Sequence, residues 1–158
     1  MLASIKEFFE RHVGLMTDGA GAVSERGVQL ATAALLLEMM RIDYQTSEAE
    51  RRTVLAGLEE SFALSETEAT DLLSLAEAAG PATDYFQYTS RINKSFTLEQ
   101  KIRLLEHLWE VAYADHRLDK YEDHLAHKIA DLLYVPLQAL IAAKQRVRGA
   151  AGETPEAS

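Results

Sequence analysis

The 158-residue sequence contains no cysteine, only three prolines and no long hydrophobic run. Without cysteine the chain forms no disulfide, no zinc–thiolate site and no cysteine nucleophile. The longest apolar run, from Ala31 to Leu37, is far shorter than the ~20 residues that a membrane-spanning helix needs. Charged side chains also interrupt the N-terminus where a signal peptide has its apolar region. We therefore expect a cytoplasmic protein.

Positive charge is scarce as well, since 16 lysines and arginines stand against 25 aspartates and glutamates, a net charge of −9. Such an acidic chain repels nucleic acid and anionic membranes. We expect no nucleic-acid partner, and membrane contact only through a partner or the N-terminal helix. The common catalytic motifs are missing too: P-loop, G-x-S-x-G, H-E-x-x-H and dinucleotide fingerprint. We expect no enzyme activity.

Helix-forming patterns fill most of the sequence. β-Branched residues are sparse, no hairpin signal is present, and four capping boxes mark helix starts at Ser47, Ser65, Thr97 and Asp119. The class we predict is all-α, with about seven to eight helices. The expected ranges are 2–13, 24–42, 47–62, 65–80, 83–93, 98–115, 120–134 and 136–148.

An internal repeat relates the two halves of the chain by a shift of 72 positions, since Asp43 matches Asp115 (115 − 43 = 72). The other matched pairs are Glu38 with Glu110, Ser47 with Asp119 and Glu50 with Glu122. A repeat of this kind predicts a pseudo-two-fold bundle of two three-helix units, about 28–80 and 98–148. The most apolar helices, 28–42 and 98–114, should lie at its centre.

The predicted domain therefore covers residues 28–148. Residues 1–27 form an amphipathic helix and a glycine-rich connector in this interpretation, and 149–158 form a disordered tail. The N-terminal helix could dock on the protein, cap a homodimer or lie on a membrane surface. Its basic and acidic side chains balance, which favours docking on the protein.

The stretch "WEVAYADHRLDKYEDHLAHKIADLLYVP", with "YTSRINKSFTLEQKIRLLEHL" before it and "LIAAKQRVR" after it, resembles the TerB-like (tellurite resistance B-like) proteins of bacteria. The hallmark of that family is an "ADGxxxxxE" turn in each half, and the resemblance covers about residues 31–148. It implies a bundle of about seven helices. The family's turn glycine is replaced by His116 in the second unit and by Tyr44 in the first.

The resemblance also implies a divalent-cation site, with ligand candidates Asp43, Glu50, Asp115 and Glu122. Carboxylates brought together repel one another unless a cation or a proton neutralises them. Their hard oxygen ligands favour Ca²⁺, Mg²⁺ or Mn²⁺. A purely structural interpretation stays open, because Glu50 and Glu122 are capping-box residues and aspartates form turns at helix ends.

A second tier of candidates consists of Glu38, Glu110, His116 and Asp119. For Glu38 and Glu110, a salt bridge with Arg41 or Arg103 is the alternative to a role in a site. His124 and His127 are expected at the surface. The aromatic side chains are expected to pack between helices rather than to line a cofactor pocket: Tyr85, Phe86, Tyr88, Trp109, Tyr113 and Tyr121.

Two functions remain open. The first is a TerB-like binding or adaptor protein that takes a divalent cation at the acidic turns and is linked to tellurite or chemical stress. The second is a metal-free interaction scaffold resembling the TerB-like domain of membrane-anchored DnaJ co-chaperones. Both require a protein partner, and both allow a homodimer.

Overall fold

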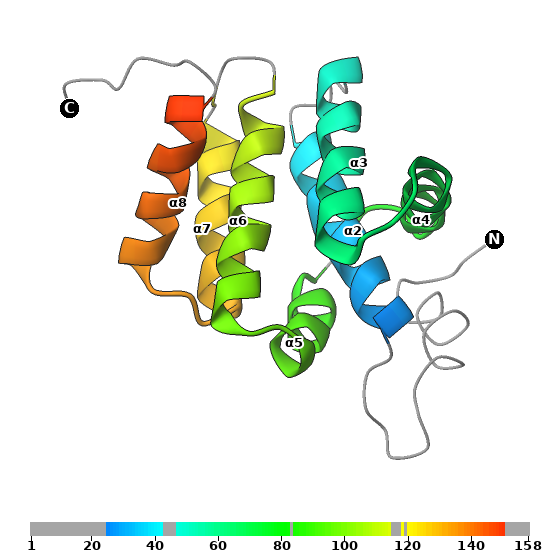
Figure 1. Ribbon diagram of the computed structural model, residues 1–158. Coiled ribbons are helices and arrows are strands. Elements are labelled where there is room, and N and C mark those ends of the chain that lie inside the picture. The colour runs from blue at the N-terminus through cyan, green and yellow to red at the C-terminus, as the bar shows by residue number, and fades with distance from the viewer. Residues whose placement is uncertain (1–24, 43–46, 83, 115–117, 119, 151–158) are drawn as a thin grey trace.

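The computed structural model describes residues 25–42, 47–82, 84–114, 118 and 120–150. Within these residues the chain forms helices and no strand, which confirms the predicted all-α class. The helices are α2 (Glu25–Arg41), α3 (Glu48–Phe62), α4 (Glu66–Ala78), α5 (Phe86–Ser95), α6 (Leu98–Ala112), α7 (Lys120–Leu132) and α8 (Leu137–Ala150) (Figure 1). The predicted N-terminal helix and connector up to residue 24, and the tail from residue 151, lie outside the described residues.

Capping boxes begin three of these helices, as their sequences predict. Ser47, Ser65 and Thr97 each accept a hydrogen bond from the backbone N–H three residues later. The Glu or Gln at that later position accepts one from the cap residue's own N–H. Each box therefore pairs two backbone groups that the helix itself leaves without partners. The fourth predicted cap, Asp119, lies outside the described residues.

Two predicted boundaries are wrong by three residues: α6 was expected to end at residue 115 and ends at Ala112, and α5 was expected to begin at residue 83 and begins at Phe86. Asp84 explains why α5 begins later than predicted, because its Oδ1 accepts a hydrogen bond from the Phe86 N–H at 2.9 Å. A side chain that bonds the backbone two residues ahead stabilises a turn instead of a helix. At the other end of the chain, α8 extends to Ala150 and includes two residues predicted to lie in the tail.

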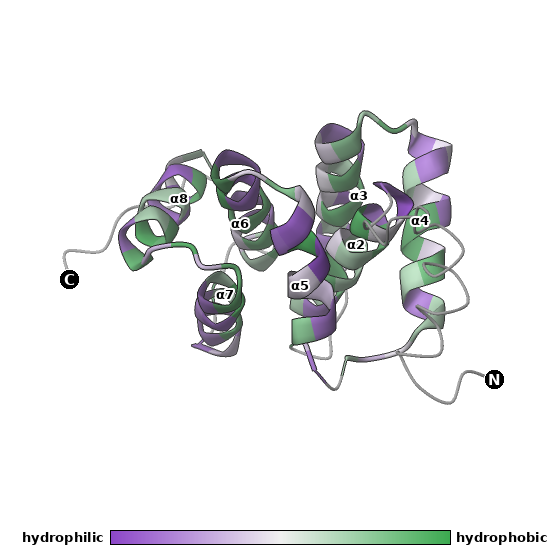
Figure 2. Cartoon of the chain, turned by 90° about the horizontal axis from the view of Figure 1, so that it is seen from below, coloured by the Kyte–Doolittle hydropathy of each residue, from purple (hydrophilic) through white to green (hydrophobic). Residues whose placement is uncertain are grey.

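The helices form two groups, which contact each other where α2 and α3 pack against α6. Helix α2 packs against α3 and α4, and α6 packs against α7 and α8, while α2 and α3 both contact α6. Helix α5 contacts both α2 and α7 and lies between the two groups (Figure 2). The pairing within each group follows the predicted three-helix units. Their two-fold relation stays a prediction.

Helix α2 is the most enclosed element, since every residue from Gly27 to Met40 is buried. The second central helix, α6, buries Trp109 completely. Among the aromatic residues predicted to pack, Tyr88 and Tyr113 are also buried. The prediction was wrong for Phe86 and Tyr121, which are more than half exposed. They occupy the first turns of α5 and α7 on faces that no described helix covers.

Helix α7 ends at an unfavourable backbone position. Tyr134 has φ of 59°, and the Val135 N–H bonds the Ala130 carbonyl at 3.0 Å while the Tyr134 N–H bonds the Asp131 carbonyl at 3.1 Å. This is a Schellman motif, whose left-handed residue is usually glycine. The side chains of Asn93 and Lys101 bond the Leu132 and Leu133 carbonyls and complete the helix end.

Tyr134→Gly should therefore raise the free energy of unfolding by about 0.5–1 kcal/mol, because glycine adopts left-handed φ without steric cost. Little packing is lost, since Tyr134 is 76% exposed. Urea denaturation measures the change. Tyr134→Ala is the matched control, since it removes the ring but keeps the Cβ, and it should show no such gain. Equal effects of the two substitutions would contradict the left-handed assignment.

Candidate functional site

The two acidic turns flank helix ends that lie at one end of the bundle. Helices α2 and α6 end there, and α3 and α7 begin there (Figure 1). Two predicted site residues, Glu50 and Glu122, occupy the first turns of α3 and α7. The predicted site residues Asp43, Asp115, His116 and Asp119 lie outside the described residues.

Glu50 and Glu122 are buried, with 0% and 2% of their surface exposed. The cap explains part of this for Glu50, whose Oε1 accepts a hydrogen bond from the Ser47 N–H at 3.0 Å. A cap does not require burial, however, because Glu68 makes the same contacts with Ser65 on an exposed surface. Burying a carboxylate is costly unless opposite charge or hydrogen bonds compensate. Capping alone therefore does not explain the burial of Glu50.

Glu38 is a structural residue in this arrangement. Its Oε2 accepts a hydrogen bond from the Ala82 N–H at 3.0 Å and pairs with Arg41 at 3.2 Å. The predicted salt bridge with Arg41 is therefore confirmed. Burial raises the pKa of Glu38, although the Ala82 N–H and Arg41 oppose that rise. The residue ties α2 to the segment between α4 and α5.

Glu110 has a different partner from the one expected. Its Oε1 lies 2.7 Å from Nδ1 of His107. Arg103, seven residues earlier, pairs instead with Glu60 and Glu106. Seven residues correspond to about 10 Å along a helix, so Glu106, one turn from Arg103, is the nearer carboxylate.

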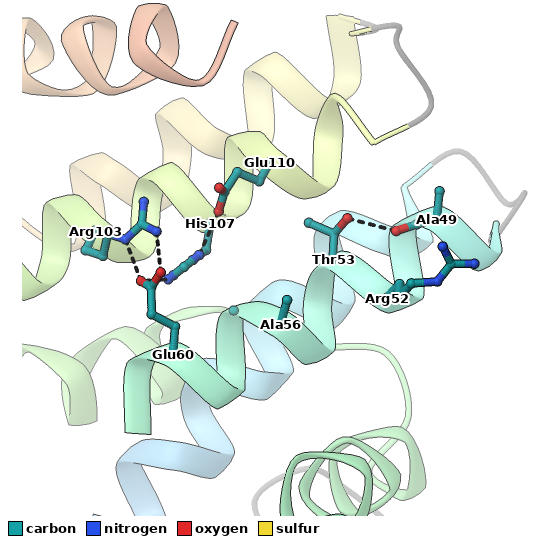
Figure 3. A pocket seen from close by; sticks show the side chains of 9 residues that line it. Ala49, Arg52, Thr53, Ala56, Glu60, Arg103, His107 and Glu110 are labelled. Atoms are coloured by element: carbon teal, nitrogen blue, oxygen red, sulfur yellow. Dashed lines mark hydrogen bonds and ion pairs between the residues drawn. The ribbon is translucent and has the colours of Figure 1, made fainter. Parts of the chain in front are cut away.

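A cleft between α3 and α6 is lined by charged side chains that include Glu60, Arg103 and Glu110 (Figure 3). Its volume is about 410 Å³, and it is lined by Ala49, Arg52, Thr53, Ala56, Gly57, Glu60, Arg103, His107 and Glu110. Small residues of α3 face charged residues of α6 across it (Figure 3). Its upper part, at Ala49 and Glu110, lies near the end of the bundle that carries the acidic turns.

His107 lies at the centre of this cleft, and its side chain is only 4% exposed. Nδ1 contacts Glu110, and Nε2 lies 3.0 Å from Oε2 of Glu60 on α3. Its contact with Glu60 joins α6 to α3.

Gly57 permits this contact, because a Cβ at that position would lie 3.2 Å from Cγ and Nδ1 of the His107 ring. No sequence pattern predicted a role for either residue. One signal was present, since a glycine inside a helix costs about 1 kcal/mol relative to alanine and often marks a close approach. The partner on α6 could not be identified from that signal alone.

Arg103 extends the network along α6. It donates hydrogen bonds of 2.6 Å to both carboxylate oxygens of Glu60, which hold the pKa of Glu60 below its usual value. It also bonds Glu106 at 2.7 Å, and Arg146 of α8 bonds the other oxygen of Glu106 at 2.6 Å. Burial opposes ionisation of Glu106, but the two arginines lower its pKa below the usual value. Three helices are thus joined by one charged network.

This network should make stability depend on pH in the acid range. A carboxyl with a lowered pKa stabilises the fold above its ordinary pKa of 4.5 and loses that contribution as the pH falls through the folded-state pKa. The double variant Glu60→Gln, Glu106→Gln should therefore lose less stability between about pH 5 and pH 3 than the wild type. Urea denaturation at each pH measures the slope.

Glu38→Gln is a control that should change the pH dependence of stability in the opposite direction. The raised pKa of Glu38 means that its proton binds the folded state more tightly, so this residue opposes acid destabilisation. Its removal should make the loss of stability on acidification steeper. A slope unchanged in both variants would contradict the assigned charge network.

The described residues contain no cluster of three or more His, Asp or Glu side chains that could hold a metal ion. A complete set of oxygen ligands around Glu50 or Glu122 would need groups from 43–46, 115–117 or 119, which are not described. The chemistry of the two buried carboxylates fits a hard divalent cation. They are the described residues that would hold it, and the cation would place positive charge beside them.

The described helices form a small all-helical domain with a buried glutamate in the first turn of each of α3 and α7. A comparison with known families matches residues 29–145 to the family described as Tellurite resistance protein TerB. The match covers more than half of the chain, which belongs to the TerB family. Searches of curated proteins and of solved structures found no match. Across the described helices, none is both long and apolar enough to cross a membrane.

Proposed function

We propose that this TerB-family protein is a non-enzymatic binding or adaptor protein that takes up a divalent cation at its acidic turns. The observation that supports the proposal is the burial of Glu50 and Glu122 at the same end of the bundle. Asp43 and Asp115 precede these glutamates by the same number of residues in the two halves. Oxygen ligands of this kind suit Ca²⁺, Mg²⁺ or Mn²⁺.

The proposed role of the cation is to join the acidic turns to the buried glutamates and so to stabilise the end of the bundle. A bound cation stabilises the folded state by about 2.7 kcal/mol at a free concentration 100 times its Kd. The shape of the bundle end, and with it the affinity for a protein partner, would then depend on the cation. The family description suggests that this binding serves resistance to tellurite or related chemical stress.

Calorimetric titration of Ca²⁺, Mg²⁺ and Mn²⁺ into the metal-free protein tests this function. We expect the wild type to bind one of these cations, and we expect Asp43→Asn with Asp115→Asn to weaken binding at least tenfold, about 1.4 kcal/mol. The matched control is Glu66→Gln with Asp71→Asn, which removes two charges from the exposed face of α4. A stoichiometry of one cation per chain indicates a shared site, and two indicate separate turns.

Two results would contradict the cation function: no heat from the wild type at millimolar cation, or equal loss in the control variant. Growth of a deletion strain on tellurite, complemented with the wild type or the Asp43, Asp115 variant, tests the stress link separately. Complementation by the variant as well as by the wild type would separate tellurite resistance from cation binding.

The metal-free scaffold is the second candidate, and exposed apolar side chains on α8 favour it. Leu137 and Ile141 lie one helical turn apart and are 57% and 41% exposed. Leu137 also lines a groove of about 500 Å³ between α7 and α8. Exposed apolar patches often mark interaction surfaces. If this function is correct, Leu137→Ser with Ile141→Ser abolishes capture of the native partner, and Phe86→Ser, an exposed control on α5, does not.

A further inference from the structure

A second groove lies at the opposite end of the bundle, where the chain enters α2. The start of α2, the end of α3 and the start of α6 meet at this end (Figure 1). The groove has a volume of about 570 Å³, and its lining includes Val28, Phe62, Ala63 and Phe96. It is therefore separate from the acidic turns and from the scaffold surface on α8.

An aromatic pair, Phe62 and Phe96, lines this groove, and the described helices cover it only in part. The rings of Phe62 and Phe96 have centroids 6.1 Å apart and are tilted by 43°. Both side chains are only partly buried. Leu98, two residues beyond Phe96, is 51% exposed. Apolar side chains gain free energy when they leave water, so the groove offers a binding surface for an apolar segment.

The chain itself supplies such a segment. Residues 2–13, outside the described part of the structure, place Leu2, Ile5, Phe8, Phe9 and Val13 on one stripe at helical spacing. Eleven residues, 14–24, separate this segment from Glu25, which lines the groove. A connector of that length spans at most ~36–40 Å, and it begins at the groove itself. The tether therefore holds the segment at high local concentration beside the two rings.

The charges around the groove agree with this occupant. Glu25 and Glu60 line it, and the segment carries Lys6 and Arg11. Its Glu7 and Glu10 make it neutral overall, so the acidic lining does not repel it as it would an acidic peptide. We propose that residues 2–13 form an amphipathic helix that packs its apolar stripe into this groove, over Phe62 and Phe96 of the same chain.

Cross-linking tests the proposal cleanly, because the natural chain has no cysteine. The test variant carries Glu10→Cys beside the stripe and Ser95→Cys at the groove, where Ser95 is exposed. The matched control pairs Glu10→Cys with Gln145→Cys, an exposed position on α8. A short bifunctional maleimide should join the first pair within one chain at least about tenfold faster than the control pair.

Two further double variants test whether the apolar stripe causes the faster cross-linking of the first cysteine pair. Phe8→Ser with Phe9→Ser should remove the difference between the two cysteine pairs, whereas Lys6→Ser with Glu7→Ser, on the polar side, should leave it. Circular dichroism verifies that each variant is folded. Equal rates for the two pairs would overturn the proposal, and so would a product of doubled mass, because it would place the segment on a second copy.

Discussion

Trp109→Ala should lower the free energy of unfolding by about 3–5 kcal/mol, the usual cost of removing a buried tryptophan. Trp109 is fully buried on α6. The His127 ring of α7 meets it edge-on at 6.4 Å, and the Lys144 ammonium of α8 lies 5.1 Å from its ring. Its loss opens a cavity where three helices meet. Domains of this size are stable by only about 5–15 kcal/mol, so the variant should be close to unfolding.

The measurement is urea denaturation followed by circular dichroism, because Trp109 is the only tryptophan and the variant has no indole fluorescence. Trp109→Phe retains an aromatic ring and should cost clearly less. Tyr121→Ala is the surface control on α7, since Tyr121 is 61% exposed, and its effect should stay near 0.5 kcal/mol. A Trp109→Ala effect no larger than this control would contradict the packing of α6.

His107→Ala should cost about 1.5–3 kcal/mol, because it removes the hydrogen bond to Glu110 and a hydrogen bond to a charged group contributes about that much. The more specific result concerns Gly57. In the wild type, Gly57→Ala gains helix propensity of about 1 kcal/mol but places a Cβ 3.2 Å from the His107 ring. In the His107→Ala background that contact is gone, so the full gain should appear.

The double-mutant cycle for Gly57→Ala and His107→Ala should therefore show a coupling of about 1 kcal/mol, read from urea denaturation with Trp109 fluorescence. Gly149→Ala is the control, because a Cβ at Gly149 meets no neighbouring atom, and its effect should be the same in both backgrounds. Effects of Gly57→Ala and His107→Ala that add to within ~0.3–0.5 kcal/mol would show that the two residues are not coupled.

The fold was predictable because its signals are local. A capping box is a motif of only four residues that predicts where a helix starts. The predicted starts at Ser47, Ser65 and Thr97 are confirmed. The mostly apolar sequence of α2 indicated its central position in the same way, because apolar residues on all sides of a helix imply burial on all sides. The ends were harder to predict, since the left-handed turn at Tyr134 uses a residue that does not favour it.

The candidate site was predictable only in part, because its contacts join distant segments. The burial of Glu50 depends on helices packed around α3 and not on its capping sequence, as exposed Glu68 shows. The contact between Glu60 and His107 joins residues far apart in the sequence, so no spacing rule predicts it. Asp43 and Asp115, on which the cation function depends, stay predictions.

The enclosure of α2 also determines how this chain can change over evolutionary time. Because neighbours cover all of its sides from Gly27 to Met40, saturation mutagenesis should find intolerance at nearly every position there, without the 3.6-residue period that one-sided helices show. Helices α3, α4 and α8 keep exposed faces and can accept substitutions without loss of the core. Sequence divergence within the bundle should therefore collect on its outer faces, where new partners can be acquired while α2 stays nearly constant.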